Sequence, residues 1–290
     1  MSTFDLSDPM TFAGVFVVSL FVVAFSIELI FGRITGSKRP LRDGLFMLVG
    51  LLSQSMLAGA LIGSLAGAMA VVVWPGSAGA FSHISFWLAF PVIFVVEEFV
   101  HYVLHRYAHE WRWLWKLHRT HHSSMDLNVG VVYRYNVFWV LLLPQSWIGA
   151  FAVYFGQAEA FVTAVLITFS VNVLTHSSFR WDLWLREKLP FINPAWNIMA
   201  TVITTPDAHH AHHAYGKTGH PNGNYAITLF IFDVLLGTAK LPNSKQQNYG
   251  LPISPRLHWA EELLWPLVKK PLLPKPVATE PVESAQHKSG

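Results

Sequence analysis

The sequence predicts an all-α fold: a polytopic membrane helical bundle with a histidine-rich site for two metal ions on its cytoplasmic side. Three observations lead to this prediction, namely long apolar segments, a one-sided distribution of basic residues, and clustered histidines. Of the 290 residues, 52% are hydrophobic and only 13% are charged. Soluble domains carry about 25% charged residues, so a bilayer is the better solvent for this chain.

Five segments are apolar enough to cross a membrane, for which a helix needs about 20 residues. They are residues 11–31, 45–74, 86–104, 137–155 and 158–174. The second segment is long and rich in glycine, so it is expected to be either one tilted helix or a broken pair. Residues before the first segment resemble no cleavable signal, so that segment is expected to be a retained anchor.

The rest of the chain is expected to complete a single membrane domain covering residues 1–270. Residues 256–270 have the composition of a helix lying on the membrane surface. Residues 271–290 are rich in proline and polar side chains, and we expect them to form a disordered tail.

Basic residues predict the orientation of the bundle. No lysine or arginine occurs before Arg33, between Arg42 and Arg106, or between Arg134 and Arg180. If the chain starts outside and crosses once at each segment, all 20 basic residues fall on one side. The positive-inside rule makes that side cytoplasmic. The net charge of +3, without a basic run interleaved with aromatics, gives no indication of a nucleic-acid partner.

Eight of the 15 histidines fall into three short groups. The groups are His105 and His109; His118, His121 and His122; and His209, His212 and His213. Spacings of three and four place side chains on one face of a helix, so each group can present its imidazoles to one point. In the predicted topology all eight lie just beyond the inner ends of the third and fifth segments.

This convergence predicts a metal site, because many buried rings without a metal would each need a hydrogen-bond partner. The chain has no cysteine, which excludes thiolate ligands and iron–sulfur clusters. Neutral imidazole suits zinc, copper, iron and nickel. Eight histidines exceed the four ligands of one tetrahedral zinc, so two ions with about four histidines each are predicted. The spacing alone does not choose the metal.

The three groups also carry a family resemblance, since they follow the pattern HX3H, HX2HH and HX2HH in that order. Asn128 after the second group, and Asn224-Tyr225 followed by the run from Phe232 to Thr238, strengthen it. With these motifs, which lie within residues 98–238, the chain resembles the fatty acid hydroxylase/sterol desaturase superfamily. Within it, the chain looks most like the alkylglycerol monooxygenase branch.

Members of this superfamily are membrane enzymes with a di-iron centre. The resemblance therefore implies two iron ions and an O₂-dependent monooxygenase that hydroxylates or desaturates a lipid chain or a sterol-like substrate. It also implies an external electron donor, either a protein or another reductant. Two other readings stay open: a catalytically inactive metal-binding membrane protein, and a metal transporter, whose ligands should lie near the middle of the membrane.

Several positions depart from the family pattern. Glu98 stands where an aspartate is usual, and it is expected to orient a ligating imidazole. His101 replaces a tyrosine on the same helical stripe as His105, and it is a further candidate ligand. His176, at the end of the last segment, is another. His210 should point away from the ligand face and lie behind it.

Overall fold

The structure is a computed structural model that describes residues 8–253 and 256–274, so residues 275–290 of the expected tail lie outside the described residues. In the described part the elements are helical, which confirms the all-α prediction. They are α1 (Pro9–Ile30), α2 (Pro40–Ser53), the π-helix η1 (Gln54–Ile62), α3 (Gly63–Val73), α4 (Phe86–Glu110), α5 (Arg112–His122), the 3₁₀ helices η2 (Val129–Tyr133) and η3 (Trp139–Leu142), α6 (Pro144–Tyr154), α7 (Ala158–His176), α8 (Trp181–Lys188), the 3₁₀ helix η4 (Pro190–Ile192), α9 (Asn193–Met199), α10 (Pro206–His213), α11 (Ile231–Leu235) and α12 (Trp259–Leu264).

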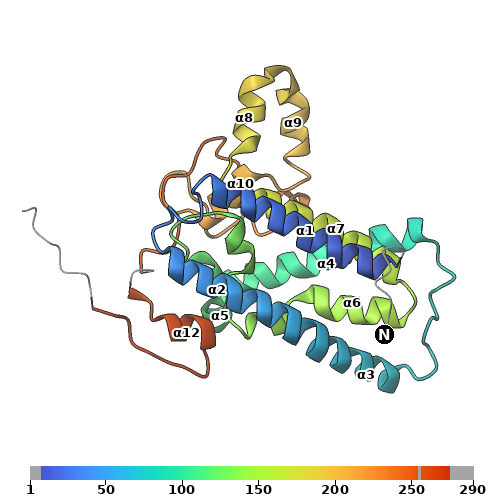
Figure 1. Cartoon of the computed structure of the whole chain (residues 1–290). Coiled ribbons are helices and arrows are strands. Elements are labelled where there is room, and N and C mark those ends of the chain that lie inside the picture. Colours follow the sequence, from blue (N-terminus) through green and yellow to red (C-terminus); the bar gives the residue numbers. More distant parts are fainter. Residues whose placement is uncertain (1–7, 254–255, 275–290) are drawn as a thin grey trace, which may run out of the picture.

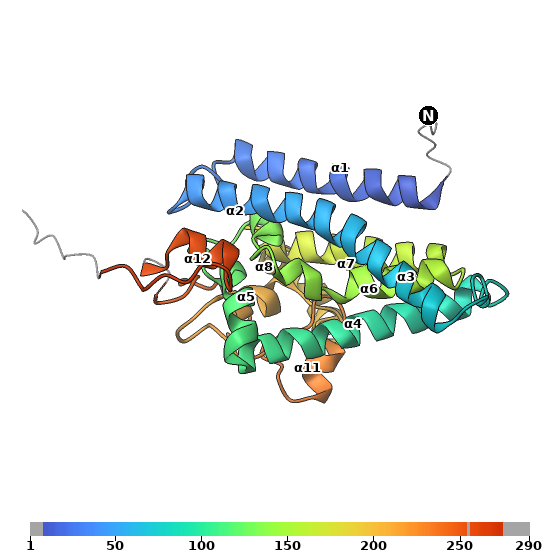
Figure 2. The ribbon, with the colours of Figure 1, turned by 90° about the horizontal axis from the view of Figure 1, so that it is seen from below.

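Four helices are long and apolar enough to cross a membrane. They comprise Thr11–Ile30, Pro40–Val73, Phe86–Glu110 and Ala158–His176. The helices run side by side along one direction, and α7 packs against both α1 and α4 (Figures 1 and 2). Large apolar side chains such as Val72 and Trp87 remain exposed on their outer faces, as expected for surfaces that lipid covers.

The second apolar segment forms one continuous helix, which settles the choice between a tilted helix and a broken pair. α2, η1 and α3 together cover 34 residues. The middle part is a π-helix, a rare conformation that occurs often at functional sites. Gly50 lets α2 approach the η2 loop closely, because a β-carbon there would collide with the carbonyl oxygen of Tyr133.

The fourth expected span is wrong as a single long helix. Residues 137–155 form the short 3₁₀ helix η3 and then α6, which has 11 residues. Pro144 lacks an amide hydrogen and has a fixed φ, so it starts a new helix instead of continuing the old one. The chain still reaches the far end of the bundle, where the backbone N–H of Gly79 donates to the carbonyl of Tyr154 at 2.8 Å.

The helix ends that carry basic residues meet at one end of the bundle. There α1 ends, α2 begins, α4 and α7 end, and α5 and α10 are located (Figure 1). The fully buried guanidinium of Arg134 joins these parts: its Nε is 3.1 Å from Oδ1 of Asp43 and its cation lies over the ring of Phe46.

The helix expected over residues 256–270 is shorter than predicted. Only α12 forms, and Pro266 prevents it from continuing. Glu262 and Leu263 are buried, and the hydroxyl of Thr120 donates to the carbonyl of Glu262 at 2.6 Å. The segment therefore packs against α5 on one side, while Trp259 and Leu267 stay exposed on the other.

Candidate metal centre

Nine histidines converge at the end of the bundle where α5 and α10 are located. They form two groups, and within each group the ligand nitrogens lie within 4.8 Å of one another. The first histidine group is His105, His109, His118, His122 and His212, and the second histidine group is His121, His176, His209 and His213. All nine are buried except His109, which is half-buried. Each group has the donor set of a site for one metal ion.

Helical geometry explains why neighbouring histidines on one helix belong to different groups. His105 and His109 share a face of α4, and the chain turns at Trp111 so that α5 packs beside the end of α4. Adjacent residues in a helix point about 100° apart. His122 therefore faces the first histidine group while its neighbour His121 faces the second. The same offset separates His212 from His213 on α10.

Several nitrogens within each group are almost in contact. The Nε2 atoms of His105 and His212 are 3.0 Å apart, and those of His118 and His122 are also 3.0 Å apart. In the second histidine group, Nε2 of His176 lies 3.0 Å from that of His209. Imidazoles bind a metal at about 2.0–2.1 Å, so two ligands at right angles come about 3 Å from each other. The spacing fits ligands that share one ion.

Backbone carbonyls accept hydrogen bonds from the opposite ring nitrogens. Nδ1 of His105 donates to the carbonyl of Tyr225 at 2.6 Å, and Nδ1 of His212 donates to that of Gly223 at 2.7 Å. On α7, Nδ1 of His176 donates to its own helix at Asn172, at 2.8 Å. A neutral imidazole that donates through Nδ1 has its lone pair on Nε2. These bonds therefore turn the metal-binding nitrogens toward the two groups.

Asp233 holds the loop that orients His105. Its carboxylate accepts hydrogen bonds from the backbone N–H groups of Tyr225 and Ala226, both at 2.8 Å, and from the hydroxyl of Thr238 at 2.6 Å. The run from Phe232 to Thr238, which the sequence singled out, thereby acquires a structural reason. Through Asp233, this run holds the backbone of Tyr225 in place, and the carbonyl of Tyr225 orients the imidazole of His105.

Burial sets the protonation state of the histidines outside the spanning helices. It lowers the pKa of six imidazoles well below the ordinary value, and neighbouring imidazoles lower it further. The six are His118, His121, His122, His209, His212 and His213. The neutral form that binds metals is therefore the one present at neutral pH. Among the described residues, Nε2 of His109 and Nε2 of His213 are buried without a hydrogen-bond partner. This is expected for nitrogens that bind a metal ion.

Two weaker candidates turn out differently. His176 joins the second histidine group, although no other histidine in its segment suggested it. His101 belongs to neither group: its ring centroid is 6.1 Å from that of His105, and its Nδ1 accepts a hydrogen bond from Gln145 at 2.8 Å. His210 faces away from both groups, as expected, and hydrogen-bonds to the Ser177 carbonyl at 3.0 Å.

The expected contact between Glu98 and an imidazole is not formed. One oxygen of Glu98 accepts from the hydroxyl of Thr168 at 2.8 Å. The other accepts from the backbone N–H groups of Thr228 and Leu229, at 2.8 and 3.1 Å. Because seven helical residues span about 10 Å, Glu98 lies too deep in the bundle to reach His105. Glu98 instead links α4 to α7 and to the loop that contains Thr228 and Leu229.

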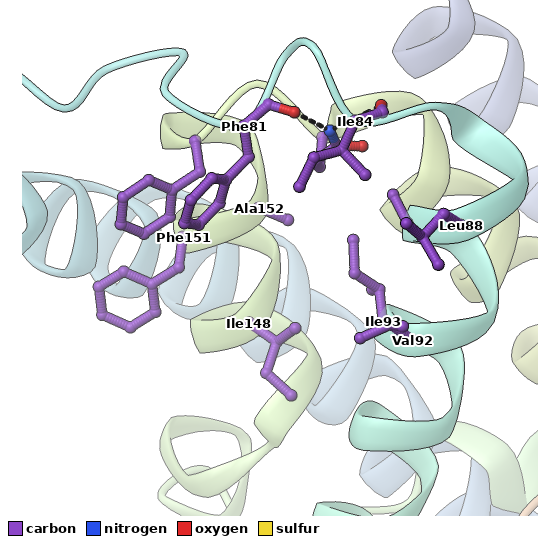
Figure 3. Close-up of a pocket in the computed structure, with 11 residues that line it drawn as sticks. Phe81, Ile84, Leu88, Val92, Ile93, Ile148, Phe151 and Ala152 are labelled. Carbon is purple, nitrogen blue, oxygen red and sulfur yellow. Dashed lines mark hydrogen bonds between the residues drawn. The ribbon is translucent and has the colours of Figure 1, made fainter.

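A cavity of about 340 Å³ lies between the spans beside the histidines. Its wall contains polar residues that the sequence analysis did not single out, among them Gln54, Glu97, Gln145 and Asn172. A polar side chain inside an apolar segment is the signal that would have found them. A different hollow, of about 510 Å³, lies between α4 and α6 at the other end of the bundle (Figure 3). No histidine lines it, so it is not part of the metal centre.

Comparisons with known proteins match the part of the chain that contains the metal centre. The fatty acid hydroxylase family model matches residues 90–238, just over half of the chain. The matched region begins in α4 and ends at Thr238, so it contains all nine histidines. No solved structure matches the chain.

Curated relatives include the alkylglycerol monooxygenases of Homo sapiens, 29% identical over 54% of this chain, and of Xenopus tropicalis, 32% identical over 58%. Ornithine lipid hydroxylase OlsE of Rhizobium tropici is 29% identical over 55% of this chain. The matched regions cover 32%, 33% and 46% of these relatives, so the chain spans a third to a half of their length. The chain belongs to the fatty acid hydroxylase family, in a branch similar to the alkylglycerol monooxygenases.

Proposed function

We propose that this protein is a membrane-bound di-iron oxygenase that hydroxylates a lipid chain or a sterol-like substrate. The observation that carries the proposal is the pair of histidine groups, with five and four imidazoles, beside a cavity between membrane spans. The relatives support it, because their names describe a monooxygenase of alkylglycerols and a hydroxylase of an ornithine lipid.

The proposed reaction inserts one atom of O₂ into a C–H bond and reduces the other atom to water. The products are an alcohol and one water molecule, so each turnover consumes two electrons and two protons. Iron in the two histidine groups would supply the O₂ and one-electron chemistry. The electrons must come from an external reductant, and an electron-donor protein or another reductant is therefore part of the proposal.

The chain's own residues have three tasks in this scheme. The histidines hold the ions, and the carbonyls of Tyr225 and Gly223 keep two of their rings in position. Aromatic side chains keep water out: the ring of Trp115 lies 5.0 Å from that of His109, and the ring of Trp139 lies 4.6 Å from that of His118. A dry, ordered surrounding protects a reactive oxidant from side reactions.

The proposal includes an orientation, with the N-terminus outside and the histidine groups and C-terminus in the cytoplasm. It is supported by the positions of the basic residues in the sequence, which fall near the helix ends that meet at the histidines. Reporter fusions after Pro75, Thr120 and Gly290 should read outside, inside and inside. An outside reading at Thr120 would reverse the proposed topology.

The function itself is tested with isotopically labelled oxygen. Membranes that contain the wild-type protein, supplied with ¹⁸O₂ and a reductant, should form lipids that have gained one labelled oxygen atom. His118→Ala should form none, whereas His83→Ala, which changes an exposed histidine far from both groups, should behave as wild type. If metal is bound but no lipid gains label, the inactive metal-binding alternative is correct.

A further inference from the structure

The cavity beside the metal centre lies among α1, η1, α4, α6 and α7. Three residues of its wall touch the histidine groups. The ring of His101 lies 6.1 Å from that of His105, and the ring of Tyr135 stacks 5.8 Å from that of His121. The carbonyl of Asn172 accepts from Nδ1 of His176. A single layer of side chains therefore separates the cavity from both groups.

Glu97 faces this cavity without a hydrogen-bond partner. Its side chain is completely buried, and neither carboxyl oxygen has a partner among the described residues. In the described part of the chain, Gln145 is the one neighbouring donor: one N–H of its amide donates to His101, and the other is directed toward Glu97 without reaching hydrogen-bond geometry. The next residue, Glu98, has three donors. Buried polar groups are nearly always paired, and an ionisable residue inside a membrane usually has a function. The carboxyl of Glu97 therefore has hydrogen-bonding capacity that the described residues do not fill, as expected of a group that binds a ligand.

A groove on the surface of the bundle lies against the cavity wall. It has a volume of about 700 Å³, lies between α3 and α6, and shares Gln54, Gln145 and Val165 with the cavity wall. Gly63 and Gly67 line it, and no atom lies within 4 Å of the position where either would carry a β-carbon. The groove is therefore wide enough for a hydrocarbon chain that arrives from the bilayer.

We propose that the substrate is a lipid with an uncharged hydrogen-bond donor on its chain, either a hydroxyl or an amide N–H, and that Glu97 accepts this hydrogen bond. The inference rests on the proposed function and makes its substrate class narrower. The chain reaches the cavity along the groove, and the donor fixes which carbon lies against the metal centre. Among the described wall residues none is a lysine or arginine, so a carboxylate or phosphate at this position would be unpaired and is excluded.

Photo-crosslinking tests the inference without any turnover. The probes are a long-chain primary alcohol with a diazirine in its chain, its methyl ether, and the corresponding fatty acid, each added to protein in lipid nanodiscs. The alcohol should label the cavity segment of α7, around Val165 and Phe169, at least about tenfold more than the ether or the acid. Glu97→Leu should remove this preference, and the matched control Glu159→Gln, at an exposed position, should keep it. Equal labelling by alcohol and ether, or an unchanged preference in Glu97→Leu, would overturn the inference.

Two further variants keep the test decisive. If Glu97→Leu does not fold, Glu97→Met has a similar length and no oxygen acceptor, so it should also remove the preference. Gly67→Leu should block the groove and reduce labelling by the alcohol. Ala68→Leu, one position further on an exposed face, should not. Wild-type labelling in Gly67→Leu would contradict the route.

The crosslinking result and the oxygenation result are independent. If the alcohol is preferred but no lipid gains labelled oxygen, the proposed function fails while the binding site for a donor-bearing chain stands. If labelled lipids form but the alcohol has no preference, the function stands and the role given to Glu97 is wrong.

Discussion

His105 and His212 lie 107 positions apart in the sequence, yet their Nε2 atoms are 3.0 Å apart. Both rings donate through Nδ1 to carbonyls of the same loop, at Tyr225 and Gly223. Since both nitrogens then face each other with lone pairs, they cannot hydrogen-bond to one another, and a cation between them accounts for the contact. The loop thus acts as a common support for two proposed ligands from different helices.

The first prediction concerns the nine histidines. Replacing any one of them with alanine should abolish turnover while the protein still inserts, because an ion that lacks one ligand loses the geometry that the reaction needs. The positions are His105, His109, His118, His121, His122, His176, His209, His212 and His213. His101→Ala should retain both ions. Activity of purified variants in nanodiscs checks this, and full activity in two or more of the nine would mean that the site is misassigned.

The second prediction concerns Asp233, which positions His105 through the loop. Asp233→Asn should weaken metal affinity or activity about 10–100-fold without abolishing it, the usual effect of losing a group that orients a ligand. Metal release to a chelator measures the effect, and the iron spectrum should change with it. Thr238→Val should be milder, because it removes only one of the hydrogen bonds to Asp233. A variant that unfolds more easily but holds iron as wild type does would assign Asp233 a purely structural role.

The third prediction concerns Glu98, whose carboxylate joins three segments of the fold. Glu98→Ala leaves two buried backbone N–H groups without an acceptor, so the free energy of unfolding should fall by about 1–3 kcal/mol. The metal content of the folded fraction should stay near that of wild type, because no imidazole contacts Glu98. Thermal unfolding and metal analysis on the same sample test this. Loss of iron without loss of stability would restore a direct role at the metal centre.

The fourth prediction concerns pH. Of the nine grouped histidines, the six outside the spanning helices have pKa values well below the ordinary value of about 6.5. The unfolded chain therefore binds more protons than the folded protein near and below that pH. Their contribution to stability is present above about pH 6.5 and decreases as the pH falls toward the lower folded-state values. The melting temperature of metal-free protein should fall between about pH 7 and pH 5, and a constant or rising value would contradict the buried cluster.

The parts of the site that repeat within one helix were predictable from the sequence. Spacings of three and four predicted that the eight histidines of the three sequence groups lie together, and they do because α4, α5 and α10 are regular helices. His176 has no such partner in its segment, and only the packing of α7 against α10 brings it to the second histidine group. The fourth span was mispredicted because apolar composition outweighed the break that Pro144 imposes.

Residues that act across segments were the least predictable. Glu98 was assigned by its position relative to His105, but its partners come from α7 and a distant loop, which no local pattern reveals. The segment that contains α12 was amphipathic enough to suggest a membrane surface, and its buried pairing of Glu261 with Arg119 depends on a contact 142 residues away. Such contacts are set by tertiary packing.

The number of metal ions per chain tests the central claim most directly. Protein purified with iron and measured by elemental analysis against quantitative amino-acid analysis should contain two iron ions per chain, one for each histidine group. Variants at His118 and at His209, which belong to different groups, should each lower that value. A reproducible value of one ion in a fully folded chain with all nine histidines intact would contradict the two-ion centre.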